Sequence, residues 1–157
     1  MIRMHLVNTT DIDDDLLREI IRFTRPANIS NFDISVKYSD SINAVAGSAR
    51  RHRFDGFSKV SIRINRNVKF PYAQQAHGAY LEFTYLDENE MLIVIIAHEL
   101  RHIWQQKHHN GMVYNSRGKY SERDADVYAM RKLREWRRKH GISYDETQNL
   151  VTKLIDL

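Results

Sequence analysis

Two histidines and a glutamate lie within one five-residue segment, His98-Glu99-Leu100-Arg101-His102. In a helix of about 3.6 residues per turn, positions four apart share one face, so both imidazoles can reach a single metal ion at about 2.0 to 2.1 Å. Glu99 is rotated about 100° from His98, where its carboxylate can take a proton from a water molecule on the metal. The pattern predicts one zinc ion with Glu99 as general base, since zinc lowers the pKa of its water from about 15.7 towards 7. The alternative is that both histidines are core residues satisfied by hydrogen bonds.

A catalytic zinc site needs a third protein ligand, and His108 is one candidate. It follows His102 by six residues, the spacing of the HExxHxxGxxH pattern of the metzincins. That pattern uses its glycine to break the helix, whereas Gln105 stands at this position here. If the helix continues, His108 lies about 15 Å along the axis from His98, at about 1.5 Å per residue, and on a different face. We therefore expect His108 to be a solvated histidine.

Glu122 is the other candidate, in the segment Ser121-Glu122-Arg123-Asp124-Ala125-Asp126. Nineteen residues separate it from His102, and Asp126 follows four positions later on the same helical face. HExxH followed by ExxxD at this distance resembles the gluzincins, the thermolysin-like branch of the zinc peptidases. The resemblance implies that Glu122 is the third zinc ligand and that Asp126 hydrogen-bonds the far nitrogen of a zinc-bound histidine, His98. Without the upstream motif, the two acids would be a helix N-terminal acid and an ion-pair partner of nearby arginines.

The resemblance extends over about residues 58–136. Ser58–Asn65, preceded by Gly47–Arg50, is similar to the small SprT-like and ImmA/IrrE-like metallopeptidase domains of bacteria and phages. SprT-like proteins usually take a third histidine, so the ExxAD string at 122–126 is closer to the ImmA/IrrE and minigluzincin type. In zincins an edge strand beside the active-site helix pairs with the substrate backbone, and Gly78–Asp87 is the candidate by position.

An oxyanion stabiliser is also expected, because the tetrahedral intermediate of peptide hydrolysis carries charge that zinc offsets only in part. Tyr114 and Tyr120 lie between the two motifs and could donate a phenolic hydrogen bond, and Tyr114 is our candidate for this catalytic role. His109 and His140 are weaker candidates. Each of the four could equally be an ordinary surface residue.

The elements that must position these residues follow the order helix, strands, helices, which predicts an α+β domain. We expect a zincin-like arrangement, in which an N-terminal helix precedes a sheet of about three mostly antiparallel strands packed on the active-site helix, and two further helices follow. Capping signals predict helix starts at Thr10, Asp87, Ser121 and Ser143. Apolar periodicity predicts helices over about 11–25, 121–139 and from 143, and strands around 32–38, 60–64 and 81–85. The cap at Asp87 opens a helix over about 88–108, whose first half is apolar all round and so should be buried. Residues 40–58 are predicted as a loop or an irregular hairpin connection.

The length of 157 residues, with 42% hydrophobic and 28% charged residues, fits one globular domain spanning 1–157. The longest apolar run, Met91–Ala97, is far shorter than the roughly 20 residues that span a bilayer. No signal-peptide stretch is visible, so we expect no membrane contact and a cytoplasmic location. The chain has no cysteine, so a metal site must use His, Asp and Glu.

The net charge of +4 arises mostly from Arg50–Arg53 and Arg131–Lys139. Such clusters can attract nucleic acid, although a solvated helix face and a polar loop have the same composition. The leading hypothesis is a zinc-dependent peptidase with a peptide or protein substrate. One alternative is a DNA-associated metalloprotease that acts on a regulator or a DNA-bound protein. Another is a non-catalytic domain in which zinc joins two helices, but such a site has no use for Glu99 beside an open coordination position.

Overall fold

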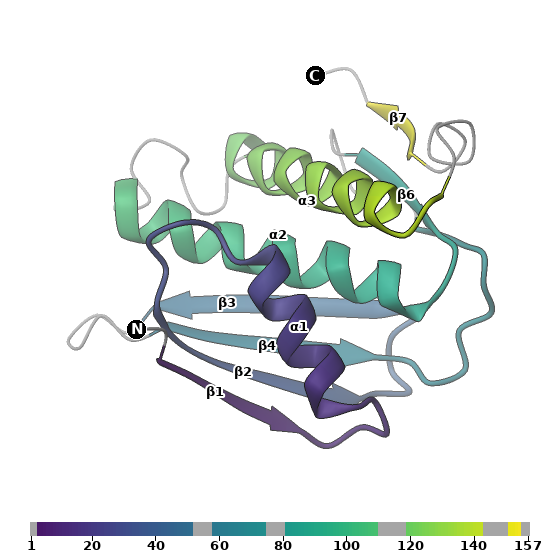
Figure 1. Cartoon of the computed structure of the whole chain (residues 1–157), viewed down its shortest axis with the longest axis horizontal. Helices are drawn as coiled ribbons and strands as arrows, with labels where there is room; N and C mark the ends of the chain where they lie inside the picture. The colour runs from purple at the N-terminus through teal and green to yellow at the C-terminus, as the bar shows by residue number, and fades with distance from the viewer. Residues whose placement is uncertain (1–2, 52–57, 75–80, 110–118, 143–150, 155–157) are drawn as a thin grey trace.

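The computed structural model describes residues 3–51, 58–74, 81–109, 119–142 and 151–154. These residues form an α+β fold with a four-stranded sheet, three helices and a small three-stranded sheet (Figure 1). In chain order the elements are β1 (Arg3–Asn8), α1 (Asp14–Thr24), β2 (Asn31–Tyr38), β3 (Val45–Arg51), β4 (Ser58–Ile64), β5 (Tyr72–Gln74), β6 (Leu81–Tyr85), α2 (Glu88–His109), α3 (Lys119–Lys139) and β7 (Val151–Leu154).

The four-stranded sheet is mixed, with strand order β1-β2-β4-β3. β1 pairs with β2 and β2 with β4 in parallel, whereas β3 runs antiparallel to β4. β1 and β2 are parallel because the crossover through α1 returns the chain to the same end of the sheet. The prediction of about three mostly antiparallel strands was therefore wrong. β1 was not predicted. β3 lies in the segment 40–58, which was predicted as a loop or an irregular hairpin connection. It was not recognised as a strand because it has small and charged residues where β2 and β4 alternate large apolar ones.

Helix α2 lies between the four-stranded sheet and helix α3 (Figure 1). Its apolar first half, Met91–Ala97, is buried as predicted, with only Ile95 partly exposed. The core includes this segment, the inward side of α1, the alternate apolar residues of β2, β4 and β6, and one side of α3. Within the described part of the chain, none of the helices is both long and apolar enough to cross a membrane.

The smaller sheet is antiparallel, with β6 between β5 and β7. The strand predicted at 81–85 is therefore present, but it belongs to this second sheet. Residues 151–154 form β7, so the final helix predicted from 143 was wrong at these positions, while 143–150 lie outside the described residues. Backbone pairing with β6 overrides the helical spacing of this short segment.

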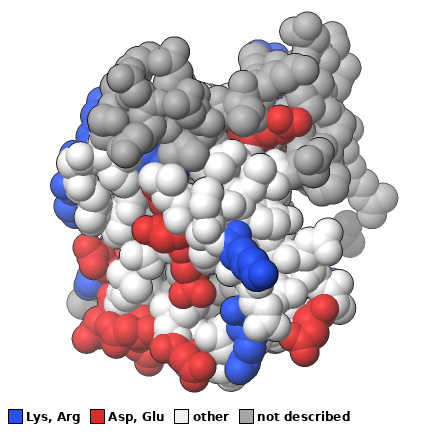
Figure 2. Space-filling view, turned by 90° about the vertical axis from the view of Figure 1, so that its right-hand side faces the viewer, with Lys and Arg blue, Asp and Glu red and all other residues white. Residues whose placement is uncertain are grey.

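Helix α1 begins at Asp14 and not directly after Thr10, where the sequence predicted its cap. The Asp13 carboxylate is the cap, since it accepts a hydrogen bond from the Leu16 amide at 3.3 Å. Exposed aspartates before and within the first turn also suit the positive end of the helix dipole. Figure 2 shows the right-hand side of Figure 1, where α1 begins, and acidic side chains gather in the lower part of this view.

The two helices that carry the predicted site begin and end close to the predicted positions. Asp87 Oδ1 accepts a hydrogen bond from the Glu90 amide at 2.9 Å and caps α2, as predicted. α3 ends where predicted, and Gly141 follows in the left-handed conformation with φ of 73°. α3 begins at Lys119, so Ser121, which was predicted as its cap, lies inside the first turn.

Candidate metal centre

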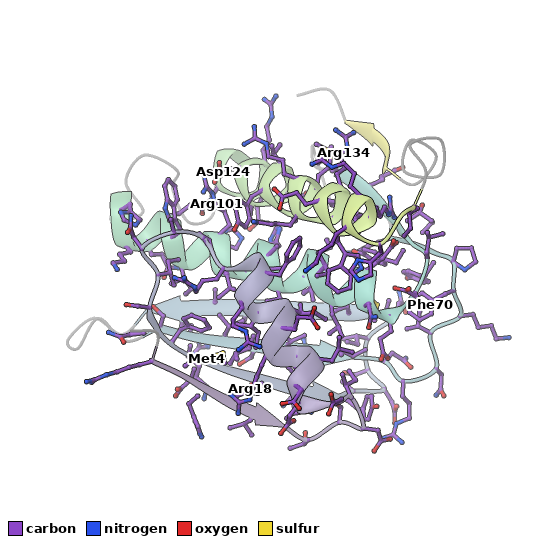
Figure 3. The ribbon with its side chains drawn as sticks, viewed as in Figure 1. Met4, Arg18, Phe70, Arg101, Asp124 and Arg134 are labelled. Atoms are coloured by element: carbon purple, nitrogen blue, oxygen red, sulfur yellow. The ribbon has the colours of Figure 1, made fainter. Side chains whose placement is uncertain are left out.

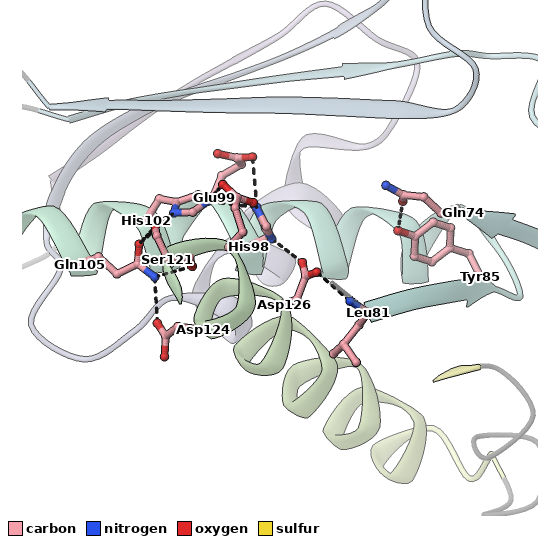
Figure 4. A network of polar contacts seen from close by, with 11 residues as sticks. Gln74, Leu81, Tyr85, His98, Glu99, His102, Gln105, Ser121, Asp124 and Asp126 are labelled. Carbon is pink, nitrogen blue, oxygen red and sulfur yellow. Dashed lines mark hydrogen bonds and ion pairs between the residues drawn. The ribbon is translucent and has the colours of Figure 1, made fainter. Parts of the chain in front are cut away.

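The HExxH residues lie in the middle of α2, next to the first turns of α3 (Figure 4). His98 and His102 share one helical face, and their Nε2 atoms lie 3.0 Å apart. Glu122 of α3 places Oε2 at 3.0 Å from His98 Nε2 and Oε1 at 3.1 Å from His102 Nε2. The structure thus brings the three predicted ligands together, close enough to bind one metal ion. We refer to the two Nε2 atoms and the Glu122 carboxylate as the ligand triangle.

Asp126 is hydrogen-bonded to Nδ1 of His98, the ring nitrogen that does not belong to the ligand triangle. His98 Nδ1 lies 2.8 Å from Asp126 Oδ1, and because an ionised carboxylate only accepts, Nδ1 carries the hydrogen and donates it. Asp126 Oδ2 accepts a hydrogen bond from the Leu81 amide at 3.2 Å, at the start of β6 (Figure 4). The contact that the gluzincin resemblance implied for Asp126 is therefore present, and in the neutral imidazole it leaves the lone pair on Nε2.

Gln105 is hydrogen-bonded to Nδ1 of His102 in the same way. This contact was not predicted from the sequence. The orientation of the Gln105 amide is fixed, because Nε2 donates to the Ser121 carbonyl and to Asp124 Oδ2, both at 2.9 Å. Gln105 Oε1 then accepts from His102 Nδ1 at 2.9 Å and from Ser121 Oγ at 2.7 Å. A glutamine three positions after a candidate ligand in one helix is the signal that could have found it, since such residues are neighbours on the helix surface.

When neutral, each histidine therefore directs the lone pair of its Nε2 at the Glu122 carboxylate. Such nitrogens and carboxylate oxygens are all acceptors, so three acceptors meet in the ligand triangle. The arrangement is repulsive unless a cation lies among the three groups. Ligand atoms at about 2.0 to 2.1 Å from a tetrahedral zinc lie about 3.3 Å from one another, close to the 3.0 Å and 3.1 Å separations of the triangle. The residues present fit a metal ion that keeps a fourth position open.

The charges of the site also favour a cation. Burial lowers the pKa of His98, but hydrogen bonds to Asp126 and Glu122 outweigh it and raise the pKa from 6.5 to about 10. Burial raises the pKa of the Glu122 carboxyl, yet hydrogen bonds from His102 and His98 hold it well below its ordinary value. Without a metal, a proton on His98 is the cation of the ligand triangle, and a metal ion must displace it.

Glu99 lies beside the ligand triangle. Its Oε1 is 4.0 Å from His98 Nε2, whereas Glu122 Oε2 is 3.0 Å from the same nitrogen, and the Glu99 side chain is only 7% exposed. Burial raises the pKa of Glu99; the two histidines oppose this, and the neighbouring carboxylates of Glu122 and Asp126 add to it. A carboxyl with a raised pKa suits a general base that works near neutral pH.

An ion pair joins α2 and α3 next to the ligands (Figure 3). Arg101 Nε donates to Asp124 Oδ2 at 2.8 Å, and its guanidinium carbon lies 3.7 Å from the ring centre of Trp104. Asp124 also accepts from Gln105, so the ion pair belongs to the network that holds His102. Because the network spans both helices, it fixes how Glu122 approaches the two histidines.

The other residues considered from the sequence do not join the ligand triangle. His108 is exposed near the end of α2 and packs against a tryptophan of the same helix with 5.1 Å between ring centres, as expected for a solvated histidine. His140 follows the end of α3, where its Nδ1 donates to a backbone carbonyl at 2.8 Å. Tyr114 lies outside the described residues, as do the side chains of Tyr120 and His109.

No protein-family model, curated protein or solved structure matches this chain. The resemblance to the gluzincins rests chiefly on residues 98–102 and 122–126. What the site can do therefore follows from its own atoms and distances.

Proposed function

We propose that this chain is a zinc-dependent peptidase of the gluzincin type, with His98, His102 and Glu122 as zinc ligands and Glu99 as general base. One observation supports this most directly: two imidazole Nε2 atoms and a carboxylate meet at 3.0 to 3.1 Å beside a buried glutamate. A structural zinc site has four protein ligands, whereas a catalytic one has three and an open position. Three ligands with a carboxylate at their side therefore favour catalysis.

Each residue has a defined task in this proposal. Bound zinc would act as a Lewis acid and lower the pKa of a water molecule at its open position. Glu99 accepts a proton from the attacking water and delivers it to the amine that leaves. Asp126 and Gln105 keep the two imidazoles in the tautomer that leaves each Nε2 free. Tyr114 is our proposed hydrogen-bond donor to the oxyanion.

The substrate backbone has an edge strand available beside α2, although it is not the expected one. Gly78–Asp87 was the candidate, but its strand β6 lies between two other strands. β3 is the edge strand that packs on α2, and no other described strand pairs with its outer edge. We propose that an extended substrate segment adds to β3 through main-chain hydrogen bonds.

The variant Glu99→Gln tests the mechanism, because an amide cannot take the proton while the ligand triangle stays intact. We expect zinc content equal to that of the wild type and hydrolysis of fluorescein-labelled casein lowered by about 10²- to 10⁴-fold. Unchanged hydrolysis in this variant would contradict the role of Glu99. A wild-type chain that binds zinc and cleaves nothing would favour the non-catalytic zinc domain.

The variant Glu122→Ala tests the ligand set. We expect its zinc stoichiometry, measured by atomic emission after dialysis, to fall well below that of the wild type. Glu135→Ala is the matched control, since Glu135 is an exposed acid of the same helix that pairs with Lys132. Full zinc retention in Glu122→Ala would remove Glu122 from the ligands.

A second candidate function, a DNA-associated peptidase, is favoured by the outer face of the four-stranded sheet. The three described helices all lie on the other face (Figure 1), so outward side chains of the strands meet solvent. The predicted basic helix offers fewer cations than expected, because Arg137 is fully buried. Five exposed cations and one carboxylate occupy outward positions of the sheet. The cations are Arg3, Lys37, Arg50, Lys59 and Arg63, and the carboxylate is Asp33.

Salt dependence of DNA binding tests this second candidate. If the sheet contacts phosphates, affinity for a short DNA duplex should fall linearly on a log–log plot against salt, because bound counterions are released. The double variant Lys59→Glu with Arg63→Glu should abolish this binding. Arg131→Glu with Arg134→Glu, on the exposed side of α3, tests the helix instead. Absence of salt-dependent binding by the wild type would exclude the DNA-associated function.

A further inference from the structure

Gly47 lies in the middle of β3, opposite Ile62 of β4, on the sheet face that packs against α2. On the same face, Val45 and Ala49 pack side chains against the core. Gly47 has none, and the side chain of Glu99 fills the space. A β-carbon at Gly47 would lie 2.8 Å from Glu99 Cγ, 2.9 Å from Oε1 and 3.1 Å from Cδ. We call this shared space the glycine slot.

The backbone conformation of Gly47 does not require glycine. Gly47 pairs in regular antiparallel register with β4, and among the described glycines only Gly141 has a positive φ. A glycine inside a strand is unfavourable, because it loses more chain entropy than other residues and packs no side chain. The remaining reason for glycine at this position is the close approach of Glu99.

Glu99 depends on packing more than the two histidines do. His98 and His102 are held by hydrogen bonds to Asp126 and Gln105. The only polar contact of the Glu99 carboxylate within the described residues is its 4.0 Å approach to His98 Nε2. Its position is therefore set by the surfaces around it, and the bare backbone of Gly47 is one of them.

We infer that Gly47 is a positioning residue of the proposed peptidase, whose missing side chain sets where the Glu99 carboxylate stands beside the ligand triangle. The catalytic part of this inference rests on the proposed function, whereas the steric part does not. Gly47 is exposed and its backbone is fixed by pairing with β4, so a larger residue there displaces Glu99 before it displaces the core. A displacement of about 1 Å near a reacting centre can lower a rate by about 10²-fold.

Steady-state kinetics of Gly47→Ala tests the catalytic part, with Ser35→Ala as the control. Ser35 lies in the inner strand β2, partly exposed on the opposite face of the sheet. We expect Gly47→Ala to lower kcat on fluorescein-labelled casein by about 10- to 100-fold, with KM and zinc stoichiometry as in the wild type. Ser35→Ala should leave all three unchanged. Full kcat in Gly47→Ala, or an equal loss in both variants, would overturn the inference.

A thermal-unfolding cycle tests the steric part without any activity measurement. Gly47→Ala should lower the Tm of the chain that carries Glu99, because the new methyl group and Glu99 compete for the glycine slot. In a Glu99→Ala background, which lacks all three contacting atoms, the same change should leave Tm unchanged or raise it. Additive effects on Tm would overturn the inference. If the wild type cleaves no substrate, the proposed function fails, and this cycle alone decides whether the slot exists.

Discussion

At the scale of single residues, the two candidate histidine ligands are held by chemically different partners. A carboxylate, Asp126, accepts from His98, whereas a neutral amide, Gln105, accepts from His102. A carboxylate partner raises the basicity of a ligating imidazole, so His98 should be the stronger zinc ligand of the two. The orientation of His102 depends instead on the network that fixes the Gln105 amide.

Loss of that amide should weaken zinc binding. Among the described residues, the variant Gln105→Leu leaves Ser121 Oγ, at 3.3 Å, as the one remaining partner for the His102 Nδ1 hydrogen. We expect zinc affinity, measured by competition with a chelating dye, to fall by about 10- to 100-fold. His108→Ala, on an exposed position of the same helix, should bind zinc like the wild type. Equal affinities in the two variants would show that Gln105 does not support His102.

Zinc affinity should also rise with pH. The pKa of His98 in the metal-free site is raised from 6.5 to about 10, so its proton must leave before zinc binds. We expect affinity to rise by up to about tenfold per pH unit from about pH 7, and to level off above about pH 10. Chelator competition in buffers of increasing pH measures this. A flat profile would contradict the protonated state that we assign to His98.

The same raised pKa makes the metal-free fold sensitive to alkali. A group whose pKa is higher in the folded than in the unfolded chain stabilises the fold below its unfolded value, here 6.5, and loses this contribution as pH rises through about 10. The free energy of unfolding of the metal-free chain, measured in urea, should therefore fall over this interval. His98→Ala should remove most of the fall.

The site could be predicted from the sequence as far as its chemistry is local. His98, Glu99 and His102 follow from helical spacing alone. Glu122 and Asp126 required the resemblance to a known motif, because no periodicity tells how two helices pack. Gln105 and Gly47 acquire their roles only through such packing, and Gly47 lies on a different element, far from Glu99 in the chain.

At the scale of elements, a buried ion pair joins α3 to the start of α2. Arg137 is fully buried, and it donates from Nε to Glu90 Oε2 at 2.8 Å and from Nη2 to Glu90 Oε1 at 2.7 Å. Nη2 also donates to the Thr84 carbonyl of β6 at 3.0 Å, and Glu90 accepts from the Leu86 amide at 2.8 Å. One ion pair thus joins both ligand helices to the small sheet.

Replacing only one partner of this ion pair should lower the free energy of unfolding. Arg137→Met leaves the Glu90 carboxylate buried without its cation, and we expect the free energy of unfolding to fall by about 3 to 5 kcal/mol. Adding Glu90→Gln removes the buried charge but keeps an acceptor for the Leu86 amide, so part of the loss should be recovered. Arg138→Met, at the exposed neighbour, is the control in urea unfolding. Equal effects of Arg137→Met and Arg138→Met would show that the pair contributes little.

The elements could be predicted where their signal is long or regular. α2 has a cap at Asp87 followed by a continuous apolar half, α3 has several turns of apolar periodicity, and β2, β4 and β6 alternate clearly. The pairing of these strands could not be predicted, because parallel and antiparallel partners are chosen by contacts distant in sequence. β3 was missed because Gly47 and its small and charged neighbours suit a loop when read without the helix that packs on them.

At the scale of the whole molecule, a bound metal ion would cross-link the two ligand helices. Zinc that binds only the folded chain stabilises it by about 4 kcal/mol when its concentration is about a thousand times Kd. For a chain of this size we expect Tm to fall by roughly 10 °C when zinc is removed with EDTA and to recover when zinc is restored. Glu122→Ala should respond far less. The same Tm with and without zinc in the wild type would contradict a metal site between α2 and α3.

The glycine slot shared by Gly47 and Glu99 should also be visible in the sequences of related chains. It couples a position on an edge strand to a position on a distant helix, so the two should change together among relatives. A chain that keeps the glutamate should keep the glycine, whereas a chain that has lost the glutamate is free to place a larger side chain on the strand. The pair would then distinguish working hydrolases from descendants that retained the metal but lost the reaction.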